Sequence, residues 1–522
     1  MKYIKGQNRE QTYLFPLSLD DAIDSENEVR LVDVFVDSLE LRDYGFKMDF
    51  AENGRPAYHP AGLLKLYIYG YLNKVRSSRD LEKECKRNIE VMWLLNNLHP
   101  DHNTISNFRR DNPKAIKKVF RQTVKLAQHF NLIGNKLLAG DSTKFRAQNS
   151  KKNNFNQKKI DRHLEYIENK LAEYNKALAD SDGDKKEQLK QDIQKQKDRR
   201  KGYKKIEKQL KETGQSQVST SDPDSRHMIV RNNITEVAYN VQSTVDDQHN
   251  LPIDYKVTDT NDSKAMGNML QRAKSILRTN EFTALYDKGY HTGSEFDTAN
   301  NLGIHTIVAI PGVAAQAPDP AYNVEHFTYD KSADHFICPE GKLLTTTGKW
   351  HKAKTYFFKR YTTKECMTCQ VKEKCTKASY GKGIQRSQYQ ELIELNKQRV
   401  KEQETYYKRR QAIVEHPYGT IKRQWGFSYI LTKKGINRAS SDVGFMFIAY
   451  NLRRMMNILG CNAMRMYLKE LNAMLLSLTA LLKLIPTLFR NDIQSSLNNY
   501  TILNRALNRL YLTQINTIYG GF

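Results

Sequence analysis

The stretch Phe282-Thr-Ala-Leu-Tyr-Asp-Lys-Gly-Tyr290 is a short apolar run that ends on an acidic residue, Asp287. A run of this length and composition predicts a buried β-strand, so the carboxylate would stand where the strand stops. Carboxylate oxygens are among the ligands that Mg²⁺ prefers in proteins. The stretch therefore predicts a sheet with a candidate metal ligand at the end of one strand.

Two other segments present an acidic residue in a comparable setting. Leu137-Leu-Ala-Gly-Asp141 is a second apolar run ending on an acid, and Glu415 lies in a helix-like pattern crowded with cations. Three carboxylates brought together would repel one another, and Mg²⁺ or Mn²⁺ would relieve the repulsion while preparing phosphodiester chemistry. Taken singly, each acid also has a plainer explanation: the two aspartates could begin turns, and Glu415 could pair with a neighbouring arginine.

The segments around Asp287 predict the fold class. Strand-like patterns cover 229–230, 237–245 and 251–257, a helix pattern covers 266–277, and a further strand covers 304–310. Strands in a row, followed by alternating helix and strand, indicate an α/β fold with a mixed sheet flanked by helices. Asp141 and Asp287 would then lie at neighbouring strand ends.

The remaining parts of the 522-residue chain suggest a division into domains. We expect a helical N-terminal DNA-binding domain over 1–130, a catalytic domain over 131–460 and a C-terminal helical tail over 461–522. Within the catalytic domain we expect a helical-hairpin insertion over 150–215 and a Cys-rich insertion over 311–400.

The hairpin prediction rests on a heptad seam of apolar residues. It consists of Ile160, Leu164, Ile167, Leu171, Tyr174 and Leu178. A weaker apolar line returns after a turn, and the polar stretch from Gly214 to Ser221 predicts a flexible loop. The Lys-rich outer face of the hairpin is either simply solvated or a clamp for DNA.

The N-terminal region contains a candidate helix-turn-helix. A helix-starting cap at Ser77-Ser-Arg-Asp80 before Leu81, a turn at Leu98-His-Pro-Asp101 and a short basic helix over 103–110 follow one another. In that arrangement the last helix enters a DNA groove. Its candidate DNA-binding residues are Thr104, Asn107, Arg109 and Arg110. An ordinary helical bundle with a basic face explains the same spacing equally well.

The overall charge favours an anionic polymer as partner. Lys and Arg total 83 against 58 Asp and Glu, a formal net charge of +25, which suits phosphate neutralisation and counterion release. The N-terminus lacks the apolar core of a signal peptide, so we expect a cytoplasmic protein. The apolar stretch from Met474 to Phe489 contains Lys483 and Pro486 and falls short of the roughly 20 residues that span a bilayer, so we expect a packing or dimerisation helix and no membrane partner.

Four of the six cysteines fall within the predicted Cys-rich insertion: Cys338, Cys366, Cys369 and Cys375. Because no export signal is evident, a Cys-x2-Cys pair flanked by two further cysteines favours tetrahedral zinc over disulfides. The long gap after Cys338 and the loose final spacing leave structural zinc and free thiols as equal alternatives.

Together these segments give the chain a resemblance to the DDE transposases of bacterial insertion sequences, whose catalytic domain is RNase H-like. The likeness extends over nearly the whole chain. It is carried by Gly54-Arg-Pro-Ala-Tyr-His-Pro60, Ser77-Ser-Arg-Asp-Leu81, Gly140-Asp141-Ser-Thr, Asp287-Lys-Gly-Tyr290 and Val414-Glu-His-Pro-Tyr-Gly-Thr-Ile-Lys422. The resemblance implies that Asp141, Asp287 and Glu415 hold two Mg²⁺ (or Mn²⁺) ions.

A subgroup of this family has the signature Tyr-(2)-Arg-(3)-Glu-(6)-Lys, which Tyr407, Arg410, Glu415 and Lys422 resemble. By that likeness, Tyr407, Arg410 and Lys422 would contact DNA. Four residues, not three, separate Arg410 from Glu415, and Gln411 occupies the strict arginine position. On an ideal helix Glu415 and Lys422 would share a face, although Pro417 and Gly419 lie between them.

The expected activity is transposition: binding of double-stranded DNA at the terminal inverted repeats, two-metal-ion cleavage, and joining of the freed 3′ ends to target DNA. The resemblance also implies a homodimer in the synaptic complex and a place at the bacterial nucleoid. Two alternatives remain open: an RNase H-like metal-dependent nuclease without strand transfer, and a catalytically inactive DNA-binding protein.

Overall fold

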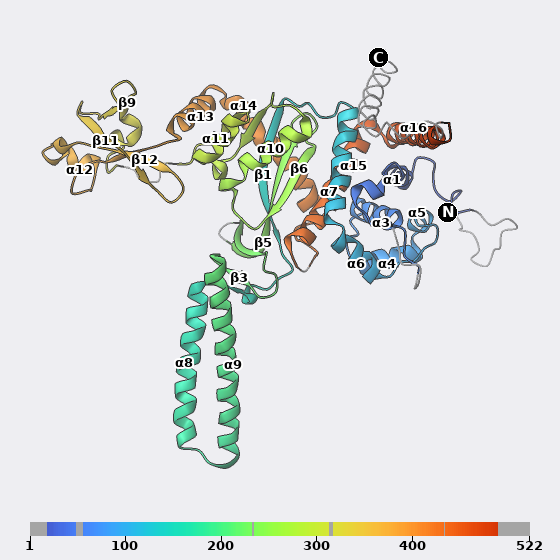
Figure 1. Ribbon diagram of the computed structural model, residues 1–522, viewed down its shortest axis with the longest axis horizontal. Coiled ribbons are helices and arrows are strands. Elements are labelled where there is room, and N and C mark those ends of the chain that lie inside the picture. The colour runs from blue at the N-terminus through green and yellow to red at the C-terminus, as the bar shows by residue number, and fades with distance from the viewer. Residues whose placement is uncertain (1–17, 49–55, 232–233, 313–316, 433, 489–522) are drawn as a thin grey trace, which may run out of the picture. The chain divides into compact units, whose positions relative to one another are not determined.

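The computed structural model describes residues 18–48, 56–231, 234–312, 317–432 and 434–488 (Figure 1). Within these, residues 40–460 belong to one compact unit, while α1 (Glu28–Asp37) and α16 (Cys461–Leu488) belong to a second. Gly54 and Arg55 of the N-terminal motif, and the part of the predicted tail beyond residue 488, lie outside the described residues. No helix in the described part of the chain is both long and apolar enough for a membrane span.

The N-terminal part of the first unit is helical, as predicted. Two of its helices begin with proline at the first position, where the missing N–H costs nothing, and Asp101 caps α6 by accepting the Asn103 and Thr104 N–H groups at 2.8 and 2.9 Å. The helices are α2 (Leu41–Tyr44), α3 (Pro60–Leu72), α4 (Ser78–Arg87), α5 (Ile89–Leu94), α6 (His102–Asp111) and α7 (Pro113–His129).

The central sheet is mixed and flanked by helices, which confirms the predicted α/β class (Figure 1). Its strand order is β4-β5-β1-β7-β8, and β6 also pairs with β5. Strand β1 is antiparallel to β5 and parallel to β7, which in turn is parallel to β8. The strands are β1 (Leu137–Arg146), β4 (Arg226–Arg231), β5 (Ile234–Asp246), β6 (Pro252–Thr258), β7 (Thr283–Tyr286) and β8 (His305–Val308), with helices α10 (Met266–Leu277) and α11 (Gly293–Asn301).

Strand β1 is longer than its apolar run suggested. The sequence predicted an end at Asp141, but the strand continues to Arg146. The reason is its antiparallel partner, because β5 pairs with every residue from Leu138 to Arg146 and supplies backbone hydrogen bonds for the polar half. Asp141 therefore lies inside a strand.

The predicted hairpin is present as α8 (Gln157–Ala179) and α9 (Gly183–Thr213). Ile160, Ile167 and Leu171 of the heptad seam are buried against the returning helix. The predicted loop from Gly214 to Ser221 is partly wrong, because β3 (Val218–Ser219) pairs with β2 (Asn154–Phe155) at the base of the hairpin. Val218 is buried there with Phe155.

The Cys-rich insertion forms a second, five-stranded antiparallel sheet that the sequence analysis did not anticipate. Its order is β13-β12-β11-β10-β9, from the strands β9 (Thr328–Asp330), β10 (His335–Ile337), β11 (Leu343–Lys352), β12 (Phe357–Thr362) and β13 (Ile384–Ser387). Helix α13 (Gln390–Glu402), although inside the predicted insertion, packs on the central sheet: Asn396 donates to Val308 O at 2.8 Å and accepts from Val308 N at 2.9 Å.

Helix α15 (Ile436–Leu459) packs against α3, α7 and β6, and joins the N-terminal helices to the central sheet. Phe445 stacks on Tyr67 at a ring separation of 4.8 Å, and Phe447 contacts Tyr255 of β6. A β-carbon at Gly444 would lie 2.6 Å from the Tyr255 hydroxyl, so the close approach of α15 to the sheet requires glycine there.

Candidate active site

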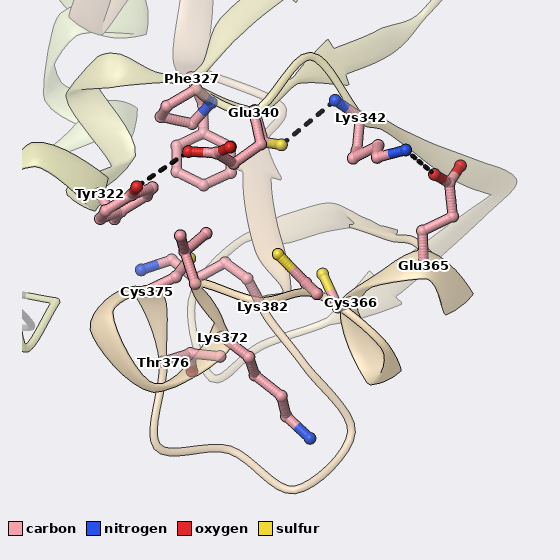
Figure 2. A pocket seen from close by; sticks show the side chains of 14 residues that line it. Tyr322, Phe327, Glu340, Lys342, Glu365, Cys366, Lys372, Cys375, Thr376 and Lys382 are labelled. Carbon is pink, nitrogen blue, oxygen red and sulfur yellow. Dashed lines mark hydrogen bonds and ion pairs between the residues drawn. The ribbon is translucent and has the colours of Figure 1, made fainter.

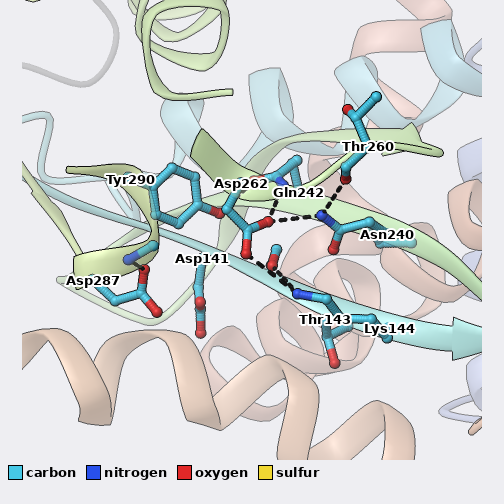
Figure 3. A network of polar contacts seen from close by, with 12 residues as sticks. Asp141, Thr143, Lys144, Asn240, Gln242, Thr260, Asp262, Asp287 and Tyr290 are labelled. Carbon is cyan, nitrogen blue, oxygen red and sulfur yellow. Dashed lines mark hydrogen bonds and ion pairs between the residues drawn. The ribbon is translucent and has the colours of Figure 1, made fainter. Parts of the chain in front are cut away.

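Asp141 and Asp287 lie on the same face of the central sheet. The parallel register pairs Ala139 of β1 with Leu285 of β7, and continuing it by two residues places Asp141 opposite Asp287. Because side chains alternate along a strand, both carboxylates share the face of Ala139 and Leu285, which is covered by Ile413 and Val414 of α14 (Glu404–Tyr418). Figure 3 shows the two side chains next to each other. The two acids were expected at neighbouring strand ends; Asp287 follows the end of β7, but Asp141 lies inside β1.

The partial exposure of Asp141 follows from the unequal lengths of the neighbouring strands. Strand β7 ends at Tyr286, so it no longer pairs with β1 at the level of Asp141, while β5 continues. The Asp141 side chain keeps 24 % exposure, which leaves a polar ligand room to approach a carboxylate otherwise enclosed by protein.

Burial raises the pKa of the Asp141 carboxyl to about 6. Arg410 opposes this shift, and the charges of Asp287 and Asp262 add to it. The Arg410 guanidinium lies 3.7 Å from Asp141 Oδ2. A buried carboxylate that is charged only with a cation beside it is the electrostatic setting that a divalent ion would satisfy.

This raised pKa gives a stability prediction for Asp141→Asn in metal-free buffer. A pKa that is raised on folding stabilises the fold below about pH 4, and that contribution is lost as pH rises through about 6. At pH 7.5 the neutral amide should therefore raise the free energy of unfolding by up to about 3 kcal/mol, and by about half as much at pH 5. Urea denaturation at both pH values measures the difference.

Asp184→Asn, at an exposed position of α9, is the matched control for that experiment. It should change the free energy of unfolding by less than about 0.5 kcal/mol at either pH. A loss of stability in Asp141→Asn at pH 7.5 would contradict the raised pKa.

Asp287 also begins a turn, the plainer role considered in the sequence analysis. Its Oδ1 accepts the Gly289 N–H at 2.8 Å and caps the short turn Lys288–Tyr290. Capping uses one carboxylate oxygen in a fixed orientation. The turn therefore holds Asp287 in place at the end of β7, and the structural and catalytic interpretations are compatible.

Two signature residues of α14 join the aspartates. Arg410 contacts Asp141, and Tyr407 lies beside it: burial raises the pKa of the Tyr407 hydroxyl, while the charge of Arg410 and a hydrogen bond with it lower that pKa. Both residues lie on the helix face that covers β1. The spacing of Arg410 departs from the family signature, but the structure places Arg410 against Asp141, a predicted catalytic acid.

Lys422 reaches β1 from a different type of helical turn. Residues 419–424 form a π-helix after Pro417, so the ideal-helix spacing between Glu415 and Lys422 does not apply. Lys422 Nζ donates to Thr143 Oγ1 at 2.9 Å and to Lys144 O at 3.0 Å. Burial lowers the pKa of Lys422, and the neighbouring Lys144 lowers it further.

Glu415 is exposed, and its Oε1 accepts a hydrogen bond from Gln411 at 2.8 Å. Glu415 lies five positions after Arg410, a rotation of about 140° on an α-helix. Arg410 and Glu415 therefore point in different directions, and Gln411, one turn before Glu415, takes the place of the signature arginine. Among the described residues no group of three or more His, Cys, Asp or Glu is arranged to hold a metal ion.

Asp262 lies within electrostatic reach of Asp141, and it is not among the candidate site residues of the sequence analysis. Helix α10 begins after Ala265 without a side-chain cap, and Asp262 instead accepts from Asn240 and Gln242 at 2.7 Å and pairs with Lys144 at 3.3 Å (Figure 3). Burial raises the pKa of Asp262, but Lys144 and the amide donors outweigh it and leave the pKa lowered. The sequence feature that could have indicated this role is its position shortly after β6.

The predicted DNA-binding residues of α6 separate into two groups. Thr104, Asn107 and Arg110 line a hollow of about 680 Å³, together with Lys47 and Arg438. Arg109 is 4 % exposed and donates to the Tyr71 hydroxyl at 2.9 Å. The prediction that Arg109 faces DNA is therefore wrong for this structure, because its charge is neutralised inside the protein by Asp442, 3.6 Å away.

Comparison with protein families gives two matches. Residues 17–111 match a transposase domain (DUF772), which ends with α6, and residues 337–456 match a transposase DDE domain, which runs from β10 into α15 and contains Glu415. Comparison with curated proteins gave no match.

The two matches support a DDE transposase of the insertion-sequence type, in agreement with the resemblance seen in its motifs. Asp141 and Asp287 lie outside both matched segments, so their assignment rests on the motifs and on the geometry described above.

Proposed function

We propose that this transposase cuts DNA at the ends of an insertion sequence and joins the freed 3′ ends to target DNA, using divalent metal ions held by Asp141, Asp287 and Glu415. The observation that carries the proposal is the pair Asp141 and Asp287 on one sheet face, with Arg410 against the buried member of the pair. Binding of a DNA substrate suits a chain with a formal net charge of +25.

The strand order supports an RNase H-like catalytic domain. Strands β1, β5 and β6 form an antiparallel set, and β7 and β8 follow as parallel strands on the other side of β1. The two insertions leave this order intact, since the hairpin lies between β1 and β4 and the second sheet lies between β8 and α13.

The donor set fits divalent metal ions in part. Asp141 and Asp287 offer carboxylate oxygens on one face, and Glu415 belongs to the helix that covers it. Bound Mg²⁺ or Mn²⁺ would supply charge stabilisation at phosphorus and a more acidic water. The proposal assigns Glu415 to that site after its carboxylate leaves Gln411.

The residues around the aspartates suit phosphate positioning. Tyr407 and Arg410 lie beside Asp141, and Lys422 and Lys144 contribute ammonium groups along the same strand. Cations held in fixed positions bind phosphate oxygens and orient the scissile bond without taking part in bond breaking. Arg410 in addition balances the charge of Asp141 before a metal ion binds.

The hollow at α6 is the proposed recognition surface for the inverted repeat. Lys47, Arg110 and Arg438 are exposed cations around it, and Asn107 offers an amide of the kind that reads base edges. We also propose a homodimer that holds two DNA ends and acts at the nucleoid in the cytoplasm, because DNA is its substrate.

Cleavage and joining assays test the function and separate its rivals. DNA that carries the sequences flanking the gene should be cut with Mg²⁺ and left intact with chelator, and the 3′ ends should appear joined to a target plasmid. Cutting without joining would identify a nuclease. DNA binding without cutting under any divalent ion would identify an inactive DNA-binding protein.

Replacing both Arg110 and Arg438 with alanine should weaken binding to element-end DNA and flatten its salt dependence. Each lost phosphate contact removes about 0.9 from the slope of log K against log salt. Fluorescence anisotropy over a salt series measures the slope. Lys185→Ala, at an exposed position of the hairpin, should leave it unchanged, and an unchanged slope in the double variant would place recognition elsewhere.

A further inference from the structure

The cysteines of the second sheet come together around one cavity. Cys338 follows β10, Cys366 and Cys369 lie in the turns after β12, and Cys375 ends the short helix α12 (Lys372–Cys375). All four line a cavity of about 30 Å³ and are free thiols (Figure 2). A space of this size accommodates one water or one small ion and no organic ligand.

We propose that Cys338, Cys366, Cys369 and Cys375 bind one structural Zn²⁺ ion that holds the second sheet together. Four thiolates suit tetrahedral zinc and leave no open position for catalysis. Their sulfur atoms surround the cavity without forming a finished ligand set, since the described residues contain no group arranged to hold a metal. Metal binding would draw them inward.

The backbone after Cys338 forms a tight turn that closes on the sulfur atom. Its Sγ accepts the Lys342 N–H at 3.3 Å, and the chain returns through Gly341, whose φ is +73°. A backbone N–H that points at sulfur stabilises a thiolate. The turn therefore orients Cys338 toward the cavity.

The turn that contains Cys366 also packs closely, against Gly381. A β-carbon at Gly381, whose φ is +89°, would lie 2.3 Å from Cys366 Cβ and 3.2 Å from its Sγ. Cys375 lines the same cavity as Cys338, Cys366 and Cys369, and thiolates held this close together repel one another. An ion would convert that mutual repulsion into attraction.

The second sheet has only a small hydrophobic core. Its core cluster consists of Phe327, Phe336, Leu344, Tyr361 and Ile384, and Cys338 and Cys375 pack against it. Small folds with such limited cores commonly depend on a metal ion or disulfides. Two cysteines thus already connect the candidate metal site to the core that it would stabilise.

The balance of charge agrees with a tetrathiolate site. Zinc with four thiolates carries a net charge of −2, and Lys342, Lys372 and Lys382 surround the cavity. Lys342 pairs with Glu365 at 2.9 Å, which links the turn after Cys338 to the turn that contains Cys366. Lys372 and Lys382 add further positive charge at the cavity.

Metal analysis of the full-length protein purified without chelator tests the proposal. We expect about one zinc per chain, retained by Cys461→Ser, a control outside the insertion, and lost in Cys369→Ser. Absence of zinc even after incubation with Zn²⁺ under reducing conditions would overturn the proposal. Iron bound in its place would overturn it as well.

Alkylation of the wild-type protein, followed by peptide mass mapping, avoids dependence on a variant that fails to fold. With zinc bound, all four cysteines should be protected, and chelator should expose the four together. Equal reactivity with and without chelator, or a Cys366–Cys369 disulfide in the purified protein, would overturn the proposal. DNA cleavage is not the readout, so the result is independent of the proposed function.

Discussion

Asp287→Asn should reduce DNA strand cleavage by at least about a thousandfold, a barrier increase of roughly 4 kcal/mol. The change keeps the shape of the side chain and an oxygen that can accept the Gly289 N–H, so the turn after β7 should survive. What it removes is the negative charge opposite Asp141, and a metal ion binds an amide far less well than a carboxylate. Single-turnover cleavage of labelled element-end DNA measures the loss.

Asp247→Asn is the matched control for the catalytic variant. Asp247 pairs with Arg409 of α14 at 2.6 Å, where Arg409 is 53 % and Asp247 14 % exposed, and asparagine keeps an oxygen that can accept from Arg409. Cleavage should therefore stay within a fewfold of wild type. Undiminished cleavage by Asp287→Asn would remove Asp287 from the catalytic machinery.

Glu415→Gln distinguishes a three-acid site from a two-acid site. The amide oxygen can still accept from Gln411, so the helix surface should be unaffected. If Glu415 moves to the aspartates when metal and DNA bind, cleavage should fall as steeply as in Asp287→Asn. Wild-type activity in this variant would leave Asp141 and Asp287 as the only proposed protein carboxylates at the metal ions.

Sequence analysis predicted the parts of the site that depend on local residue patterns. The apolar runs before Asp141 and Asp287 predict two strands, and the pairing of β1 with β7 sets the acids opposite each other. The length of β1 was missed because a remote strand, β5, supports its polar half. The direction of Glu415 was missed because a step of five positions along α14 rotates its side chain by about 140° from that of Arg410. The face expected to be shared by Glu415 and Lys422 was missed because residues 419–424 form a π-helix.

Asp262 and the second sheet show a different limit of sequence analysis. The partners of Asp262 come from β1 and β5, so only the folded sheet shows that it supports Lys144. The strands of the second sheet are short or largely exposed, as in β11, whose residues alternate poorly between apolar and polar. Its cysteines carried the clearer signal, and they do gather around one cavity.

Arg109 is the most instructive error, because its partner lies 333 positions further along the chain. The guanidinium groups of Arg76 and Arg109 both meet Asp442 of α15, at 2.8 and 3.6 Å, and Asp442 is fully buried. Tyr71 donates to the same carboxylate, and Leu431 N–H donates at 2.6 Å. Burial raises the pKa of Asp442, but the two arginines outweigh it and leave the pKa lowered.

Asp442→Ala should therefore lower the free energy of unfolding by about 3–5 kcal/mol, because it leaves two buried guanidinium groups without their counter-charge. Urea denaturation followed by circular dichroism measures the loss. Asp111→Ala breaks an exposed pair with Arg110, 2.6 Å long, and should cost less than about 1 kcal/mol.

The consequence for function follows from which elements the buried carboxylate connects. Arg109 belongs to α6 and Asp442 to α15, so the ion pair ties the proposed recognition helix to the helix that packs on the central sheet. In Asp442→Ala, DNA cleavage should fall together with stability and recover at low temperature, where the fold is retained. A loss of stability below about 1 kcal/mol would show that water reaches the arginines and replaces the carboxylate.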